Sequence, residues 1–441
     1  MKRFLALLLA LVMLLSLAAC STPNGGEGAD GSGDKKLVVW LEQLFNDRPG
    51  DKLAERMMAW GDANGVEVEV SFIGAVDFAN KLNAAIEGGG MPDIFIDYNG
   101  RLLNYYPEMI AADVTDLYEE LDEAVGFSDA CANSCYFEGK ARIIPMYASG
   151  VIMHCRADKL QEAGYDAPPT TWEEVIEMAR AVSDPDNGFF GLGIGCGPAN
   201  DDDCYDLVLN YVNSNGGAMF DDDGNVTVDN PALRSWLELW RDLYAEEVIP
   251  TDALTWDSSG NNNTYLNGQS CFVFNAGTLG YSLANDESMA ELYENTWFAP
   301  MPAGSAGYVG GAKYTGFSIA EASENKELAK DLLRYIYQVD WLTEWSEYTI
   351  PLLVPAVESI AMSDLWQNDP IGKVNVESCM PEVATWWGYS CDTMEGMAVG
   401  SKLVYTFGMN EICNGVASGE MTVDEAIAQY EALAQEIKDN Q

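Results

Sequence analysis

The chain has 441 residues and is strongly acidic, with 70 Asp and Glu against 23 Lys and Arg and a formal net charge of −47. A field of this sign repels phosphate polymers, which argues against nucleic acid as a partner and favours neutral or cationic ligands, although the charge also serves simply to keep an exposed protein soluble. About four hundred residues follow the N-terminal segment, enough for two domains with separate cores.

The first residues resemble the export signal of a bacterial lipoprotein. Lys2 and Arg3 precede an apolar run that ends in Leu17-Ala18-Ala19-Cys20, with small residues where a signal peptidase cuts. This run is shorter than the roughly 20 residues that a membrane-spanning helix needs. We therefore expect residues 1–19 to be removed and Cys20 to carry a lipid such as palmitate. The mature protein would then be anchored to the extracytoplasmic face of the cell membrane.

Residues 20–35 form a segment with almost no apolar side chains, so we expect a flexible tether. The hydrophobic periodicity that follows predicts a strand at 36–41, a helix over 53–60 and an alternating strand at 66–73, which together make a βαβ unit. A further helix leads to a strand at 93–97 and extends a parallel sheet.

Capping boxes predict where two later helices begin. Thr171 is followed by Glu174 at the third helical position, and Thr422 is followed by Glu425 in the same way. Between them, Asp223-Gly224 predicts a hairpin turn. Strands and helices thus alternate along the chain.

Few residues support catalysis or metal binding. His154 is the single histidine, and it lies in an apolar run, which excludes a metal site with several imidazoles and favours a buried, neutral ring. The glycine-rich loops that cradle phosphates are absent from the sequence, and Gly224 is misplaced for a calcium loop. The sequence therefore predicts no cofactor and no metal. Paired carboxylates for glycoside hydrolysis stay open because acidic residues are everywhere.

Ten cysteines include Cys20, which leaves nine. In an exported protein, close spacing allows disulfides. Cys155 and Cys271 lie in apolar strand-like runs and are expected to be buried thiols. The spacing allows three small loops, which are Cys131 with Cys135, Cys196 with Cys204, and Cys379 with Cys391. The sequence does not determine the pairing.

A set of aromatic, amide and acidic residues falls in predicted loops at strand ends. Planar rings cover the apolar faces of sugars, while amides and carboxylates bond their hydroxyls, and a neutral polyol needs both. Among them Tyr98, Trp256, Trp386 and Trp387 are expected to stack on the ligand. The full set of candidate ligand-binding residues is Trp40, Glu42, Asp97, Tyr98, Asn99, Tyr147, Trp256, Asp257, Asn275, Trp386, Trp387 and Tyr389. The same rings would box a cationic ligand such as a polyamine or a basic peptide, which is the alternative.

A collinear series of short segments spans the chain, including Met91-Pro-Asp-Ile-Phe95, Pro168-Pro-Thr-Thr-Trp172, Gly216-Gly217 and Ile350-Pro351. Together these segments resemble the extracellular solute-binding proteins of bacterial ABC importers, in the large family that includes maltose- and oligosaccharide-binding proteins. Met153-His-Cys-Arg-Ala-Asp158 departs from the Tyr-Asn-Lys-Asp string of many relatives. The ligand of any one relative is therefore not carried over.

The resemblance implies an α/β, two-lobed periplasmic-binding-protein-like fold of type II, in which each lobe is a mostly parallel sheet flanked by helices. Lobe one would comprise 36–148 with 299–345, and lobe two 149–298 with 346–441, joined by hinge segments. It also implies a monomeric substrate-binding lipoprotein, not an enzyme, which captures a mono- to oligosaccharide between the lobes and delivers it to an ABC permease. An exported glycosidase is the alternative from another class.

Overall fold

The strands of the computed structural model connect into one large sheet and one small one. The structure describes residues 35–44, 47–198, 202–379, 384–385 and 393–440. Contacts set residues 36–441 apart from residues 1–35 as one unit. The strands are β1 (Lys35–Glu42), β2 (Val66–Ile73), β3 (Ile94–Tyr98), β4 (Tyr136–Phe137), β5 (Lys140–Ala141), β6 (Ile144–Arg156), β7 (Phe190–Leu192), β8 (Ser270–Ala276), β9 (Thr296–Ala299), β10 (Gly310–Ile319), β11 (Val354–Pro355) and β12 (Ala384–Thr385).

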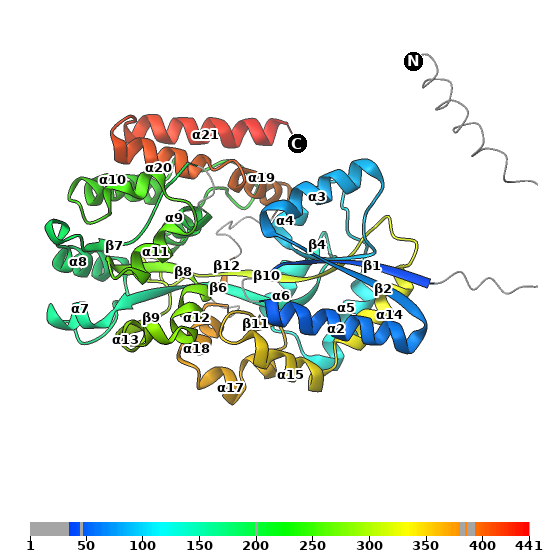
Figure 1. The fold of residues 1–441 in the computed structure, drawn as a ribbon. Helices are drawn as coiled ribbons and strands as arrows, with labels where there is room; N and C mark the ends of the chain where they lie inside the picture. Colours follow the sequence, from blue (N-terminus) through cyan, green and yellow to red (C-terminus); the bar gives the residue numbers. More distant parts are fainter. Residues whose placement is uncertain (1–34, 45–46, 199–201, 380–383, 386–392, 441) are drawn as a thin grey trace, which may run out of the picture. The chain divides into compact units, whose positions relative to one another are not determined.

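β6 is the long strand that joins the two halves of the large sheet, whose order is β2-β1-β3-β10-β6-β8-β7 (Figure 1). Its first part pairs antiparallel with β10, from Ile144 to Gly150, and from Val151 onward it pairs antiparallel with β8. Parallel pairs lie further out, between β1 and β3 and between β7 and β8. In the middle of the sheet, β10 pairs antiparallel with β3 and β6, and β6 pairs antiparallel with β8.

The first half has its own hydrophobic core, with Phe95, Phe317 and Trp345 among its buried members. Figure 1 shows α2 and α3 on opposite sides of β1 and β2. This agrees with the βαβ order predicted from periodicity. The helices of this half are α2 (Asp47–Asn64), α3 (Ala75–Gly88), α4 (Asn99–Leu103), α5 (Thr115–Val125), α6 (Asp129–Cys135), α14 (Lys326–Ile336), α15 (Val339–Thr349), α16 (Glu358–Ala361), α17 (Asp364–Gln367) and α18 (Pro370–Ser378).

The second half is organised around another core, which includes Trp172, Trp236 and Tyr430. Its α-helices are α7 (Ala157–Glu162), α8 (Trp172–Val182), α9 (Asp202–Ser214), α10 (Pro231–Ala245), α11 (Gly260–Leu266), α12 (Thr278–Asn285), α13 (Ala290–Glu294), α19 (Met394–Val404), α20 (Gly408–Ser418) and α21 (Val423–Asp439). Short 3₁₀ helices are η1 (Pro185–Asn187), η2 (Thr251–Thr255) and η3 (Glu287–Met289).

Both predicted capping boxes are confirmed at the starts of α8 and α21. The Thr171 and Thr422 side chains accept hydrogen bonds from the backbone N–H of Glu174 and Glu425, whose carboxylates bond back to the cap residues. Two otherwise unsatisfied N–H groups are thereby paired at each helix start.

Residues 354–379 fall differently from the expected lobe boundaries, which placed 346–441 in lobe two. Buried Val354, Trp366 and Val376 belong to the first core. The reason is β11, because Val354 pairs with Ala148 on the part of β6 that serves the first half. Buried residues join the second core from Val399 onward.

Of the three expected cysteine loops, two can be checked, and neither holds a disulfide: Cys196 and Cys204 are buried and are not joined to each other. Cys131 and Cys135 are separate buried thiols in α6, so the disulfide that their spacing allowed is not formed. Residues four apart on a helix point their Cβ atoms in nearly the same direction, whereas a disulfide needs them to converge. Cys155 and Cys271 are buried thiols, as expected. Cys391, the expected partner of Cys379, lies outside the described residues.

Among the helices within the described ranges, none has the length and apolar character needed to cross a membrane.

Candidate functional site

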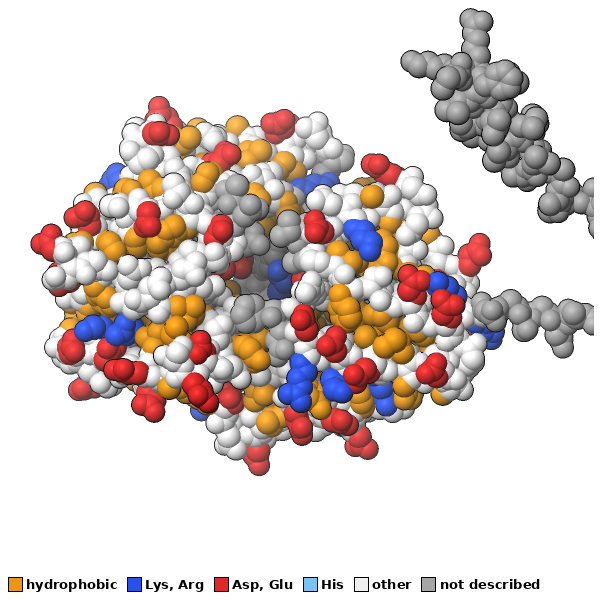
Figure 2. Space-filling model, in the orientation of Figure 1, with side chains coloured by type: hydrophobic (Ala, Val, Ile, Leu, Met, Phe, Trp, Pro, Cys, Tyr) orange, Lys and Arg blue, Asp and Glu red, His pale blue; other side chains and the backbone are white. Residues whose placement is uncertain are grey.

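A cavity of about 300 Å³ lies where the crossing strands meet the ends of β1 and β8. We call it the inter-lobe cavity. From the first half Glu42, Tyr147 and Thr315 line it, and from the second half Gly277 and Thr278. Figure 2 shows the surface hollowed between the two halves, with a basic patch visible inside. Ser149, Lys313, Thr349, Leu352 and Leu353 also line it.

Strand ends place these side chains. Glu42 is the last residue of β1, Tyr98 is the last of β3, and Gly277 and Thr278 directly follow β8. Because β1 and β3 are parallel, their carboxyl ends meet at one edge of the sheet, where ligands bind in open α/β sheets.

Below the cavity, the buried guanidinium of Arg101 joins two carboxylates. Its Nε donates to Asp97 Oδ1 at 2.7 Å and its Nη1 donates to Glu42 Oε2 at 3.0 Å. Asp97 is fully buried, and this burial raises its pKa to about 6 against the opposing pull of Arg101. Arg101 therefore holds the half-buried Glu42 carboxylate at the edge of the cavity.

Tyr98 connects the first half to Tyr405, the residue that follows α19 in the second half. Its hydroxyl hydrogen-bonds that of Tyr405, and the Lys313 ammonium lies 4.5 Å from the centroid of its ring. Nearby, Ser401 Oγ donates to the carbonyl of Gly100 at 2.5 Å. These contacts cross between the halves next to the inter-lobe cavity.

On the opposite wall, Asn275 positions a residue of the cavity. Its amide nitrogen donates to Asp203 Oδ2 at 3.1 Å and to Asn262 Oδ1 at 2.9 Å. Its amide oxygen accepts a hydrogen bond from Thr278 Oγ1 at 3.2 Å. Asn275 is buried and acts on the cavity through Thr278.

The predicted site residues thus divide into groups. Glu42 and Tyr147 line the inter-lobe cavity, while Asp97, Tyr98 and Asn275 lie behind its lining. Trp40 lies in the first core, with the Lys81 ammonium 4.2 Å from its ring centroid. Trp40 lies two residues before the end of β1, so its side chain packs in the core and does not reach the edge of the sheet.

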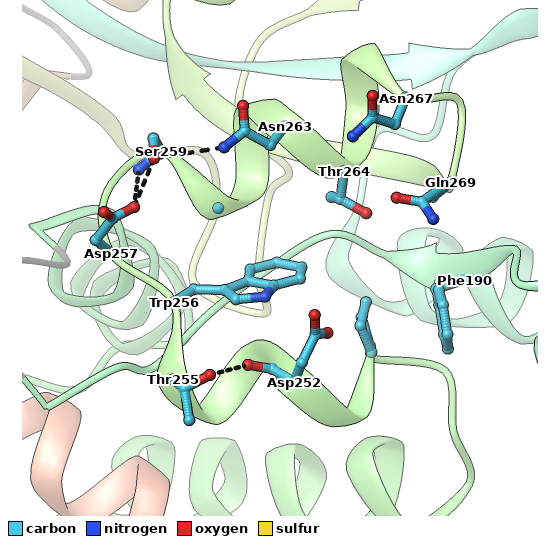
Figure 3. Close-up of a pocket in the computed structure, with 12 residues that line it drawn as sticks. Phe190, Asp252, Thr255, Trp256, Asp257, Ser259, Asn263, Thr264, Asn267 and Gln269 are labelled. Carbon is cyan, nitrogen blue, oxygen red and sulfur yellow. Dashed lines mark hydrogen bonds between the residues drawn. The ribbon is translucent and has the colours of Figure 1, made fainter.

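The remaining predicted residues do not contribute to this cavity. Trp256 and Asp257 line a different pocket in the second half (Figure 3). Asn99 begins α4, and its side chain is not described. Cys20, Trp386, Trp387 and Tyr389 lie outside the described residues.

Sequence reasoning missed Lys313, Thr315 and Thr278. The rule that selected residues after strand ends applies to Thr278 and could have found it. Lys313 and Thr315 instead lie within β10, two residues apart on one face of the strand. The local sequence does not show that β10 crosses between the halves, so the polar residues of β10 cannot be distinguished from ordinary exposed residues of a strand.

Within the described residues, no cluster of three His, Cys, Asp or Glu side chains could hold a metal ion. The chemistry on offer around the inter-lobe cavity is hydrogen bonding and ring contact.

The family of bacterial extracellular solute-binding proteins matches residues 39–342, which is more than half of the chain. The chain belongs to this family. The resemblance inferred from the collinear segments is therefore confirmed.

Similar proteins extend over much of this solute-binding protein. The probable ABC transporter-binding protein of Deinococcus radiodurans is 26% identical over 239 residues, which cover 52% of this chain and 56% of the relative. The arabinooligosaccharide-binding protein of Halalkalibacterium halodurans is 23% identical over 319 residues, which cover 70% and 68%. The chain spans between 56% and 63% of the length of the first curated relatives that it matches.

Solved structures with the same fold cover nearly the whole chain. A solute-binding protein from Thermotoga lettingae, bound with α-D-tagatose, has a TM-score of 0.75 at 18% identity and covers 92% of this chain and 100% of its own. Maltose-bound MalE3 of T. maritima has a TM-score of 0.73 at 20% identity, with the same coverage. The predicted two-lobed fold is thus confirmed.

Proposed function

We propose that this chain is the substrate-binding lipoprotein of an ABC importer, which captures a carbohydrate between its lobes and passes it unaltered to permease subunits. The observation that carries the proposal is the inter-lobe cavity, whose lining joins both halves of the sheet. A ligand that touches both halves binds the closed state more tightly than the open one. The permease would then recognise the closed, ligand-bound form.

The lining suits a neutral sugar. The volume of the inter-lobe cavity, about 300 Å³, is at the lower end of the range for small-molecule sites, which fits a mono- or disaccharide unit. Glu42 offers a hydroxyl acceptor held by Arg101, and Ser149, Thr278 and Thr315 offer hydroxyls. Relatives and neighbours named for arabinooligosaccharide, maltotriose, tagatose and maltose support a sugar as the ligand class.

Charge in the cavity argues against the cationic alternative. Lys313 lines the cavity together with Glu42, so a cation would meet an ammonium as well as a carboxylate. A neutral polyol gains hydrogen bonds from both groups and meets no repulsion. The overall acidity of the chain is then a property of its surface.

The carboxylates also favour binding over hydrolysis. Glycosidases use two carboxyl groups that flank the scissile bond. Among the described residues that line the inter-lobe cavity, Glu42 alone carries a carboxylate, and it is paired with Arg101. This arrangement supplies no general acid beside a nucleophile or base.

We further propose that residues 1–19 are the export signal and that the acylated Cys20 and the tether through residue 35 keep the binding unit near its permease. The two cores correspond to the lobes that would move, with residues 354–379 in the first. A monomer would suffice, because both walls of the cavity come from one chain.

Calorimetric titration of the mature chain tests the proposal. D-tagatose, maltose, maltotriose and arabinotriose are first screened for a rise in melting temperature, and the sugar that gives the largest rise is titrated. Glu42→Ala should weaken its binding by roughly tenfold or more, since a hydrogen bond to a charged group is worth about 1.5–3 kcal/mol. Raising the ionic strength should leave the affinity of a neutral ligand nearly unchanged.

Glu55→Ala is the matched control, because Glu55 is exposed on α2 and pairs only with Lys52 among the described residues. This variant should bind like the wild type. If none of the four sugars raises the melting temperature, or if Glu42→Ala binds its sugar as tightly as Glu55→Ala does, the proposal is wrong.

A further inference from the structure

A second pocket, of about 650 Å³, opens in the second half of the molecule beside α11. We call it the Trp256 pocket, after the indole at its centre (Figure 3). Phe190, Asp252, Asn263 and Gln269 are among its other lining residues, and it shares none with the inter-lobe cavity. The two sites are therefore separate.

α11 stands between the two sites. On one side, buried Asn261 donates to Asp203 Oδ2 at 2.6 Å, within the amide network behind the inter-lobe cavity. On another face, Asn263 and Asn267 lie one helical turn apart and line the Trp256 pocket. One helix thus presents amides toward both.

Two glycines lie close to Trp256, Gly260 against its side chain and Gly197 against its backbone. A Cβ on Gly260 would come within 2.5 Å of Trp256 Cγ, and one on Gly197 within 1.7 Å of the Trp256 carbonyl oxygen. The ring therefore lies directly against the start of α11, where any larger residue would displace it. It packs partly on the second core and leaves the rest of its surface to the pocket.

Several polar side chains around this ring have no hydrogen-bond partner among the described residues. Those of Asp252, Asn267 and Gln269 are exposed and make no hydrogen bond or ion pair with another described residue. Asp257 differs, because its Oδ1 accepts from the backbone N–H and the hydroxyl of Ser259. Figure 3 shows Gln269 and Asp252 on different sides of the indole.

We propose that the Trp256 pocket binds one sugar ring of a neutral saccharide, at a site distinct from the inter-lobe cavity. The indole supplies the flat apolar surface, the amides of Asn267 and Gln269 donate to and accept from hydroxyls, and the Asp252 carboxylate accepts. The lining holds two carboxylates, of which Asp257 already accepts two hydrogen bonds from Ser259, and the three amides of Asn263, Asn267 and Gln269 outnumber them, so the lining offers donors as well as acceptors, as hydroxyls require. This inference goes beyond the function proposed above, which requires no second site.

Fluorine NMR of the mature chain tests this proposal. 5-Fluorotryptophan replaces each of the 12 tryptophans, and the Trp256 signal is assigned as the one that is missing from a Trp256→Phe variant. The probes are D-tagatose, maltose, maltotriose and arabinotriose, up to about 50 mM, which would saturate a site with a Kd of ~1 mM. At least one sugar should shift the Trp256 signal saturably, and Asn267→Ala with Gln269→Ala should raise the apparent Kd at least about fivefold.

Trp297 provides the control in the same spectrum, because it is a half-buried tryptophan of the same half that lines neither pocket. Its signal should not move with the sugar. Tyr147→Ala impairs the inter-lobe cavity, and the Trp256 shift should persist in that variant even if cavity binding fails.

Three results would overturn the second site. The Trp256 signal could remain unmoved by all four sugars, or it could lose its shift in Tyr147→Ala, which would make it a reporter of lobe closure. Tetramethylammonium chloride could shift it where the sugars do not, which would identify a cation site.

Discussion

Asp97 and Arg101 show how a buried charge can shape a binding wall without touching the ligand. The Asp97 carboxylate is fully enclosed, and its Oδ1 accepts from the Arg101 guanidinium and from the backbone N–H of Tyr98. Arg101 Nη1 donates a second hydrogen bond, to the carboxylate of Glu42. Asp97 is thus a positioning residue for Glu42.

The elevated pKa of Asp97 has a consequence for stability. In the folded chain the pKa is about 6, against ~3.9 in an unfolded one, so between these values the folded state holds a proton that the unfolded state has released. This contribution to stability is present below about pH 4 and is lost as the pH rises through 6.

Asp97→Asn lacks this titration. The free energy of unfolding of the wild type, minus that of Asp97→Asn, should therefore fall by roughly 1–3 kcal/mol between pH 4 and pH 7. Urea denaturation of both proteins at each pH measures the difference. A difference that stays constant or grows with pH would show that attraction to Arg101 outweighs burial.

At this scale, the sequence predicted residue types better than their roles. Glu42 and Tyr147 were selected by their position at strand ends, and both line the inter-lobe cavity. Trp256 was selected on the same grounds but faces another pocket, because its direction depends on close approaches to Gly197 and Gly260. Those approaches are tertiary contacts that no local pattern reveals.

The helix starts are the elements that the sequence predicts most reliably. The capping boxes at Thr171 and Thr422 are local, since donor and acceptor lie three residues apart, and both are present as predicted. Strand partners are set by contacts between distant residues. The antiparallel pairing of β6 with β10 joins residues about 170 positions apart, and periodicity carries no trace of it.

Thr422→Ala should lower the free energy of unfolding by about 1 kcal/mol, because the N–H of Glu425 loses its acceptor at the start of α21. Thr343→Ala is a matched control in the interior of α15, where the Thr343 hydroxyl, among the described residues, bonds back to the carbonyl of Val339 alone. It should be neutral or slightly stabilising, since alanine has the higher helix propensity. Guanidinium denaturation distinguishes the two. Equal effects at both positions would argue against the cap.

In the whole molecule, two crossing strands connect the two cores and border the cavity between them. β6 and β10 belong to the first core at one end and lead into the second half at the other, and the inter-lobe cavity lies beside their crossing. A small rotation about these strands would open or close its walls. The contacts of Tyr98 with Tyr405 and of Ser401 with Gly100 would have to break on opening.

The family and the two-lobed architecture could be predicted from the sequence, but the course of the chain between the lobes could not. The expected boundary placed the return to lobe two near residue 346, whereas β11 keeps residues through Cys379 with the first core. β11 has only two residues, too few to show a hydrophobic period.

Locating a bound sugar shows whether the inter-lobe cavity holds the carbohydrate. The measurement is a crystal structure of the mature chain grown with the sugar that titrates most tightly. We predict a sugar ring in the inter-lobe cavity, with hydroxyls within hydrogen-bond distance of Glu42 and Thr278. A sugar bound only outside this cavity would show that the inter-lobe cavity is not the binding site.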